Sequence, residues 1–257
     1  MALCIPLAHN VGNRRVNNMS IAYLDALSRS HVDSEAFWLD AAGAIAWDRT
    51  PSVAWTQSEG WFADGMMNTC YNAVDRHVAA GRGDAVALIY ESPVTDTRVT
   101  FTFAELQDEV ARTAGMIAAQ GVAKGDRVII YMPMVPQAVV AMLACARIGA
   151  IHSVVFGGFA APELAKRIDD ATPMILLTAS CGIEGSKIIP YKPLVEKALA
   201  LATHRVDRVL VLQRPQAIAP MQDGRDLDWD ATVADAVPVD CVSLKATDPL
   251  YILYTSG

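Results

Sequence analysis

The chain has 257 residues, enough for one large or two small domains, and its composition is that of a globular protein: 53% hydrophobic and 19% charged, with 16 Gly and 13 Pro. This apolar content argues against wholesale disorder. The net charge of −7 argues against a nucleic-acid or anionic-membrane surface, because binding phosphate backbones needs clustered Lys and Arg. A small anionic ligand is compatible with it, since a local pocket can oppose the global charge.

The cysteines and the apolar runs concern the cellular compartment. Five cysteines are widely spaced and form no C-x-x-C pair, which fits neither a disulfide framework nor a zinc site. The longest apolar run, 138–146, has nine residues, whereas a membrane-spanning helix needs roughly 20. We therefore expect reduced thiols, no membrane span and a cytoplasmic protein.

The first 84 residues differ in pattern from the rest. They hold four of the five Trp and show little strand–helix alternation, which predicts an irregular layer packed on the main domain through its aromatics. Apolar spacing predicts a helix over 21–30. Arg14 and Arg15 without acidic neighbours would also suit a transit peptide, but the simpler hypothesis is that residues 1–18 precede a natural start at Met19.

From residue 85 the chain alternates strand and helix patterns. Two short runs rich in β-branched and aromatic residues, 85–90 and 98–101, predict strands. Thr102 and Glu105 form a capping box, which predicts a helix that ends at Gly121. The later segments follow in order: strand 127–132, helix 136–148, strand 151–155, helix 162–170, strand 174–179, polar loop 180–187, helix 193–202, strand 208–212, an aperiodic stretch 213–247, and a strand over 250–254.

Strands that alternate with helices of this length indicate βαβ units with right-handed crossovers. We therefore predict an α/β fold with a doubly wound parallel sheet over residues 85–257, preceded by the Trp-rich layer of residues 1–84. In such sheets ligands bind at the carboxyl ends of the strands. The loops after 155, 179 and 254 are thus where a site is expected.

The chain ends in an apolar run followed by Thr255, Ser256 and Gly257. Glycine lets a backbone approach phosphate closely and small hydroxyls donate to its oxygens, so this pattern suits the start of a phosphate-binding loop. By itself the pattern is weak, because most strands that end in Ser-Gly simply turn.

Three longer segments resemble one family. DPLYILYTSG (248–257) resembles the start of the signature of adenylate-forming enzymes, and residues 131–171 are similar to a block typical of acetyl- and propionyl-CoA synthetases. Residues 36–52 resemble the N-terminal extension of these enzymes, and 178–193 resemble the propionyl type. The resemblance covers residues 20–257 and implies an incomplete adenylate-forming N-terminal domain: an N-terminal extension over 1–84 and the first part of the ligase domain over 85–257.

The resemblance implies a two-step reaction. A small carboxylate, propionate or acetate, attacks ATP to give acyl-adenylate, and the thiol of coenzyme A then displaces AMP, with Mg²⁺ assisting the phosphoryl chemistry. It implies that Thr255, Ser256 and Gly257 begin the loop that holds the phosphates of ATP. It places no catalytic residue and no Mg²⁺ ligand in these 257 residues, so the chain alone is expected to be an inactive fragment with an exposed sheet edge through which it self-associates.

The resemblance also implies a coenzyme A site at two places. Gly158 would let the backbone approach the nucleotide, and Lys187 would face its phosphate, with Gly185 and Ser186 shaping the turn. Acetyl-CoA synthetases often carry Arg where this chain has Glu184. Because a carboxylate repels phosphate, we expect residue 184 to have a smaller role in this site. A solvated turn is the plain alternative for residues 184–187.

Other polar residues have structural explanations. We expect His152 to be a core histidine with its hydrogen bonds satisfied, Asp169 and Asp170 to form local ion pairs at a helix end, and Cys181 to be no nucleophile. Met132 and Met134 suit core packing. Two further functions remain open: an acetate-specific ligase, and a non-catalytic coenzyme A-binding module or partner subunit.

Overall fold

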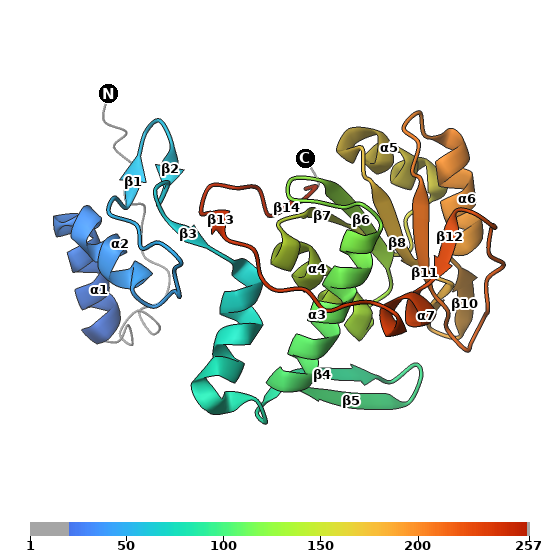
Figure 1. Cartoon of the computed structure of the whole chain (residues 1–257), viewed down its shortest axis with the longest axis horizontal. Helices are drawn as coiled ribbons and strands as arrows, with labels where there is room; N and C mark the ends of the chain where they lie inside the picture. Colours follow the sequence, from blue (N-terminus) through green and yellow to red (C-terminus); the bar gives the residue numbers. More distant parts are fainter. Residues whose placement is uncertain (1–20, 256–257) are drawn as a thin grey trace, which may run out of the picture.

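The structure, a computed structural model, describes residues 21–255. Its centre is a six-stranded sheet in the order β12-β11-β8-β6-β7-β14, and every neighbouring pair of strands is parallel (Figure 1). The strands are β6 (Arg127–Met132), β7 (Ile151–Phe156), β8 (Ile175–Ala179), β11 (Arg208–Leu212), β12 (Asp226–Asp228) and β14 (Tyr251–Ile252).

Helices cover both faces of this sheet. Helices α3 (Phe103–Ala119) and α4 (Pro136–Ile148) pack on one face with Val128 and Ile130, and α5 (Ala161–Ala171) and α6 (Lys192–Leu201) pack on the other face with Ile129 and Tyr131. Because side chains alternate along a strand, the continuous apolar run of β6 supplies both cores. The predicted doubly wound α/β fold is confirmed.

Local sequence signals set the helix ends. Thr102 accepts a hydrogen bond from the backbone of Glu105 and the Glu105 carboxylate accepts one from the backbone of Thr102, which is the predicted capping box of α3. Pro136 occupies the first turn of α4, and Gly149 ends that helix with φ of +73°, a conformation that favours glycine. The chain therefore enters β6 and β7 as predicted.

The two strands before α3 do not join the main sheet. β4 (Val86–Ser92) and β5 (Thr97–Thr102) form a separate antiparallel hairpin that packs against α3. The aperiodic stretch 213–247 holds β12, the short helix α7 (Trp229–Ala234) and β13 (Leu244–Lys245).

The polar loop predicted over 180–187 is wrong. Residues 181–190 instead form an antiparallel hairpin of β9 (Cys181–Glu184) and β10 (Lys187–Pro190) with Gly185 and Ser186 at its turn. Gly185 has φ of +58°, which a two-residue hairpin turn requires and which glycine adopts at little cost. The last strand is also shorter than the predicted 250–254.

The N-terminal layer holds two helices, α1 (Ile21–Val32) and α2 (Ser34–Ala42), and lies at one end of the molecule (Figure 1). The short strands β1 (Trp55–Thr56), β2 (Gly60–Trp61) and β3 (Met66–Met67) follow, then the π-helical turns η1 (Tyr71–Asp75) and η2 (Val78–Arg82). The α1 helix confirms the expected helix over 21–30. The proposed extension 1–18 lies outside the described residues.

The expected packing of this layer through its aromatics is not what the structure shows. The recorded ring contacts of Trp38, Trp47 and Trp61 are with one another or with Phe37 and Phe62. The layer joins the main domain through other contacts: β3 pairs with β13, the side-chain amide of Asn68 donates to the carbonyls of Ala146, Arg147 and Val242, and Asp75 forms a buried ion pair with Arg147. Within residues 21–255 no helix is both long and apolar enough to cross a bilayer.

Candidate functional site

A cavity of about 360 Å³ opens at the carboxyl end of the parallel sheet. Four groups of residues line it: the β4–β5 turn, the loop after β6, the loop after β7, and the β9–β10 hairpin with the residues that follow β10 and β11. The lining residues are Tyr90, Glu91, Ser92, Pro93, Val94, Thr95, Met132, Pro133, Met134, Phe156, Gly157, Gly158, Ile183, Glu184, Ile189, Tyr191 and Arg214. This is the edge where a doubly wound sheet binds ligands.

The two glycines after β7 have different environments. A side chain on Gly157 would place its Cβ 2.5 Å from the Met132 carbonyl oxygen and 2.7 Å from the Tyr191 ring, so internal packing requires glycine there. A Cβ on Gly158 would meet only the Phe156 ring, at 3.3 Å, and that ring is 66% exposed. Packing within the chain therefore does not explain glycine at 158, whereas close approach of a ligand would.

Tyr191 forms the floor of the cavity. Its hydroxyl donates to the Gly157 carbonyl, its ring lies 5.1 Å from that of Tyr131, and it is 2% exposed. Burial raises the pKa of both hydroxyls, that of Tyr131 to about 12, so both stay protonated donors near neutral pH. The two rings fix the loop after β7 against the sheet.

The predicted residues of the β9–β10 hairpin are divided around the cavity. Glu184 lines it, whereas Lys187 pairs with Glu184 across the turn and is exposed just outside the lining. Gly185 and Ser186 form the exposed turn. The ammonium group of Lys187 has no hydrogen-bond or ion-pair partner among the described residues, so its charge is available to a ligand.

Arg214, which the sequence analysis did not single out, is the cation in the lining. It follows β11 and is half-buried; its Nη1 donates to the Cys181 carbonyl at 3.0 Å, and its backbone N–H donates to the Ser180 hydroxyl at 2.8 Å. These contacts hold the side chain against β9. The signal that could have found it is its position, two residues beyond a buried strand at the carboxyl edge.

The end of the chain runs towards the same edge. β14 is parallel to β7, with Tyr251 opposite His152 and Ile252 opposite Ser153, so the residues after Ile252 proceed in the direction of Gly157. Thr255 is exposed and is not in the cavity lining. Ser256 and Gly257 lie outside the described residues.

The structure also shows the environments of His152, Met132, Met134 and Cys181. His152 is buried, but its Nδ1 has no partner among the described residues, so a histidine with satisfied hydrogen bonds is wrong. Met134 is 84% exposed and lines the cavity, so core packing is wrong for it, because the chain leaves the sheet at Pro133. Met132 is buried as expected, and so is Cys181.

Asp169 and Asp170, the acidic pair on α5, accept hydrogen bonds. Asp169 accepts hydrogen bonds from Thr203 and His204, which lower its pKa, and Asp170 accepts one from the Tyr254 hydroxyl. Neither takes part in a recorded ion pair with a described residue, so local ion pairs at the helix end are not what they form; Arg167 pairs with Glu163 instead.

The cavity is equipped to bind an anion. Its described lining contains no His or Cys, so it holds neither a Cys–His nor a Ser–His pair. The half-buried Arg214, the exposed Lys187 just outside the lining and the backbone at Gly158 would together suit a phosphate. The exposed carboxylates Glu91 and Glu184 oppose an anion, but solvent screens them.

Comparisons with known proteins agree with this geometry. The family described as AMP-binding enzyme matches residues 75–257, and the acetyl-coenzyme A synthetase N-terminus matches residues 23–73. An uncharacterised protein of Pseudomonas aeruginosa is 56% identical over 241 residues, 92% of this chain and 38% of that protein. The mitochondrial acyl-CoA synthetase short-chain family member 3 of Mus musculus is 50% identical over 91% of this chain and 35% of that protein.

A solved structure gives the same result. The acetoacetyl-CoA synthetase from Streptomyces lividans superposes with a TM-score of 0.79 at 28% identity, over 90% of this chain and 35% of that one. The fold and the match over most of the chain define its class, and the chain belongs to the AMP-binding enzyme family. It spans between 35% and 38% of the length of these relatives.

Proposed function

We propose that this chain is the N-terminal part of an AMP-forming short-chain acyl-CoA ligase. The whole protein would convert ATP and a small carboxylate to acyl-adenylate and pyrophosphate, and the thiol of coenzyme A would then displace AMP from the acyl-adenylate to give acyl-CoA. The observation that supports this most is the cavity at the carboxyl edge of the sheet, which Gly158 and Arg214 line and outside which Lys187 is exposed, in a chain that belongs to the AMP-binding enzyme family.

Within this proposal the cavity receives the nucleotide end of coenzyme A. Gly158 leaves room for the nucleotide against the backbone, Arg214 meets a phosphate from inside, and Lys187 meets it from the rim. An Arg fork can make two parallel hydrogen bonds to phosphate, which a Lys cannot. Glu184 is assigned no attractive role, while Gly185 and Ser186 shape the turn that carries Lys187.

The site for ATP is proposed at the end of β14. Thr255 would begin the loop that holds the phosphates, with Ser256 and Gly257 next to it in sequence. Support comes from the direction of β14, which runs parallel to β7. The division into an extension over 1–84 and a first ligase part over 85–257 is likewise proposed, and the family matches over 23–73 and 75–257 support a division in this region.

Mg²⁺ would supply charge neutralisation at the phosphates of ATP when bound. The one described group of three potential ligands is Cys70, Asp75 and Cys241, whose thiols do not suit a hard cation that prefers oxygen. This cluster therefore does not fit Mg²⁺, and we propose that the ligands of Mg²⁺ come from outside this chain.

The carboxylate substrate and the cellular compartment are also proposals. The resemblance of residues 178–193 to the propionyl type favours propionate, and acetate is the nearest alternative, since the family matched at 23–73 is named for acetyl-coenzyme A synthetase. The relative from Mus musculus is named mitochondrial, so the cytoplasm stays a prediction for this chain.

The test of this function is an assay for carboxylate activation. We expect the gene to continue in frame after the codon for Gly257 with Thr-Thr-Gly or Ser-Thr-Gly. The longer product should form acyl hydroxamate from propionate, ATP and hydroxylamine, whereas the 257-residue chain should form none. Turnover by the 257-residue chain alone would contradict the proposal that the catalytic residues and the Mg²⁺ ligands lie outside it.

The rival function is a non-catalytic module that binds coenzyme A. The same cavity supports it, because binding requires only the residues that line it. A stop codon directly after Gly257 together with measurable coenzyme A binding would favour the module over the ligase.

A further inference from the structure

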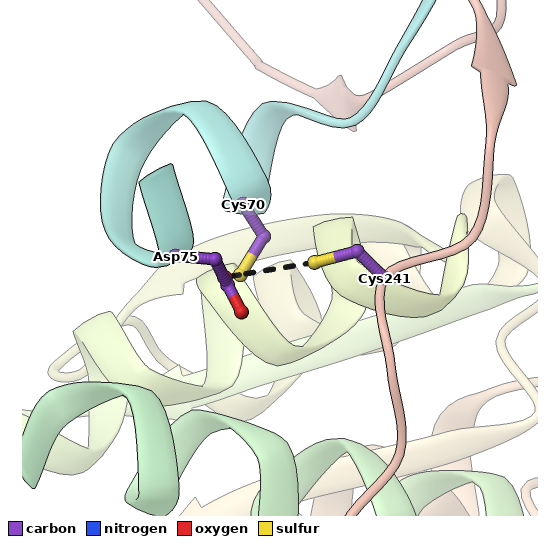
Figure 2. A group of neighbouring side chains, drawn as sticks. All are labelled: Cys70, Asp75 and Cys241. Atoms are coloured by element: carbon purple, nitrogen blue, oxygen red, sulfur yellow. Dashed lines mark hydrogen bonds between the residues drawn. The ribbon is translucent and has the colours of Figure 1, made fainter. Parts of the chain in front are cut away.

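A cluster of two thiols and a carboxylate lies outside the cavity lining, where the N-terminal layer joins the main domain (Figure 2). Cys70 precedes η1 and Asp75 ends it, while Cys241 comes from the irregular segment before β13. The Sγ atoms of both cysteines and a carboxylate oxygen of Asp75 lie within 4.8 Å of one another. Cys70 is fully buried and Cys241 is half-buried.

The surroundings of the cluster disfavour a metal ion. Both oxygens of Asp75 already accept hydrogen bonds from Arg147 Nη1, at 2.8 and 2.9 Å, and one also accepts from Gln107 Nε2 at 2.8 Å. Arg147 is 4% exposed, so its guanidinium charge is a fixed part of the cluster. A bound cation would lie against that charge and would have to displace these donors.

The same surroundings favour thiol chemistry. Cys70 Sγ lies 3.7 Å from Arg147 Nη1, and both thiols face Asp75 Oδ2, at 3.9 Å from Cys70 and 3.6 Å from Cys241. The neighbouring Cys241 thiol, and then Arg147, lower the pKa of Cys70, whereas the interaction with Cys70 and burial raise that of Cys241. Cys70 is thus the more acidic of the two thiols and the one more readily converted to the nucleophilic thiolate.

We propose that Cys70 and Cys241 are a redox-sensitive pair, which a peroxide converts to a disulfide that ties the start of η1 to the segment before β13. The Cys70 thiolate attacks one peroxide oxygen, the O–O bond breaks, and a sulfenic acid and one water result. The Cys241 sulfur then attacks the Cys70 sulfur and expels the second water. The two thiols lose two electrons to the peroxide, and both thiol protons end in water.

Formation of the bond requires a further approach of the two sulfurs. A disulfide needs an S–S distance of about 2.05 Å, so the sulfurs must approach from their present separation. Cys70 is held by η1, and Cys241 lies outside helix and strand next to Val242, whose backbone donates to the Arg147 carbonyl and accepts from Asn68, so the approach must come mainly from the two side chains. Cys145 and Cys181, also buried, belong to no such cluster within the described residues.

Peroxide treatment of the complete 257-residue chain tests this proposal. The reduced, metal-free chain is exposed to hydrogen peroxide, its remaining thiols are alkylated under denaturing conditions, and its peptides are mapped by mass spectrometry without reductant. We expect a Cys70–Cys241 cross-linked peptide that disappears after dithiothreitol. Cys145→Ala should keep the cross-link, whereas Cys241→Ala should lose it and let dimedone trap the sulfenic acid on Cys70.

Two results would overturn the proposal. One is recovery of Cys70 and Cys241 as alkylated thiols at a peroxide dose that oxidises the unfolded chain. The other is a stoichiometric zinc ion in the purified chain that shields both thiols until a chelator removes it, which would make the cluster a metal site.

Discussion

Gly157 and Gly158 are neighbours in sequence but are glycine for different physical reasons. The Cβ of an alanine at 157 would lie 2.5 Å from a backbone oxygen held in the chain, whereas at 158 it would touch only the exposed Phe156 ring. Gly157→Ala is therefore expected to destabilise the fold by roughly 1–3 kcal/mol, the usual cost of overpacking. Gly158→Ala should change stability by less than about 0.5 kcal/mol.

Urea denaturation of both variants checks this contrast, and each serves as the control for the other. If Gly158→Ala leaves stability unchanged yet weakens coenzyme A binding, glycine at 158 serves the ligand. Equal destabilisation by the two substitutions would contradict this interpretation.

His152 predicts a dependence of stability on pH. Burial lowers its pKa from 6.5 to about 4, so the folded chain resists protonation that the unfolded chain accepts. This histidine leaves stability unaffected above its unfolded pKa and lowers it as pH falls from about 6.5 towards 4, by at most about 1.4 kcal/mol per pH unit.

The variant His152→Phe keeps a ring next to Tyr251, whose centroid lies 5.8 Å away, and removes the titrating group. The free energy of unfolding, measured from pH 7.5 to pH 5, should fall less steeply for this variant than for the wild type. Parallel curves would show that His152 is not the group responsible.

At the scale of elements, α3 offers the sharpest test of a sequence signal. Its capping box satisfies two backbone donors, and α3 packs on α4, on the β4–β5 hairpin and on η1. Thr102→Ala should therefore cost about 1 kcal/mol and lower the Tm by roughly 2–4 °C. Thr100→Ala, on the exposed part of β5, is the matched control and should change the Tm much less.

The elements that sequence predicted well are those with a single consistent signal. β6, β8 and β11 are continuous apolar runs buried on both faces, and α3 and α4 have both a start and a stop signal. The β9–β10 hairpin was missed because the polar residues around its turn were given more weight than the apolar Ile183, Ile188 and Ile189. A Gly-Ser pair between such runs is itself a hairpin signal.

The candidate site was only partly predictable, for a related reason. Gly158 and Glu184 were identified through the family resemblance of their segments, and both line the cavity. Arg214, Tyr191 and the β4–β5 turn reach the cavity from elements far apart in the chain, so only the fold brings them together. Local patterns carry no record of which distant loops share an edge.

At the scale of the whole molecule, an apolar edge is exposed. β14 pairs with β7 on one side, and Leu253, Phe156 and Tyr251 near it are 69%, 66% and 54% exposed. A sheet edge flanked by such residues favours association. The chain should therefore self-associate, and Leu253→Lys should raise the monomer fraction because a charge on the edge opposes pairing.

Sedimentation velocity at several concentrations measures this. Ile218→Lys is the control, since Ile218 is 70% exposed and lies away from this edge, in the stretch between β11 and β12. A wild-type chain that sediments as a monomer and melts cooperatively would contradict the prediction.

The proposed function depends most on whether the cavity at the carboxyl edge of the sheet receives the phosphorylated end of coenzyme A. Isothermal titration of the chain with coenzyme A and with dephospho-coenzyme A, which lacks the 3′-phosphate, tests it most directly. Loss of a charge-assisted hydrogen bond should weaken binding of dephospho-coenzyme A about tenfold or more. Arg214→Ala should remove most of this difference, while Arg205→Ala, 90% exposed and paired with Asp207, should leave it intact. Equal affinity of the wild-type chain for the two ligands, or no binding of either, would contradict the central claim.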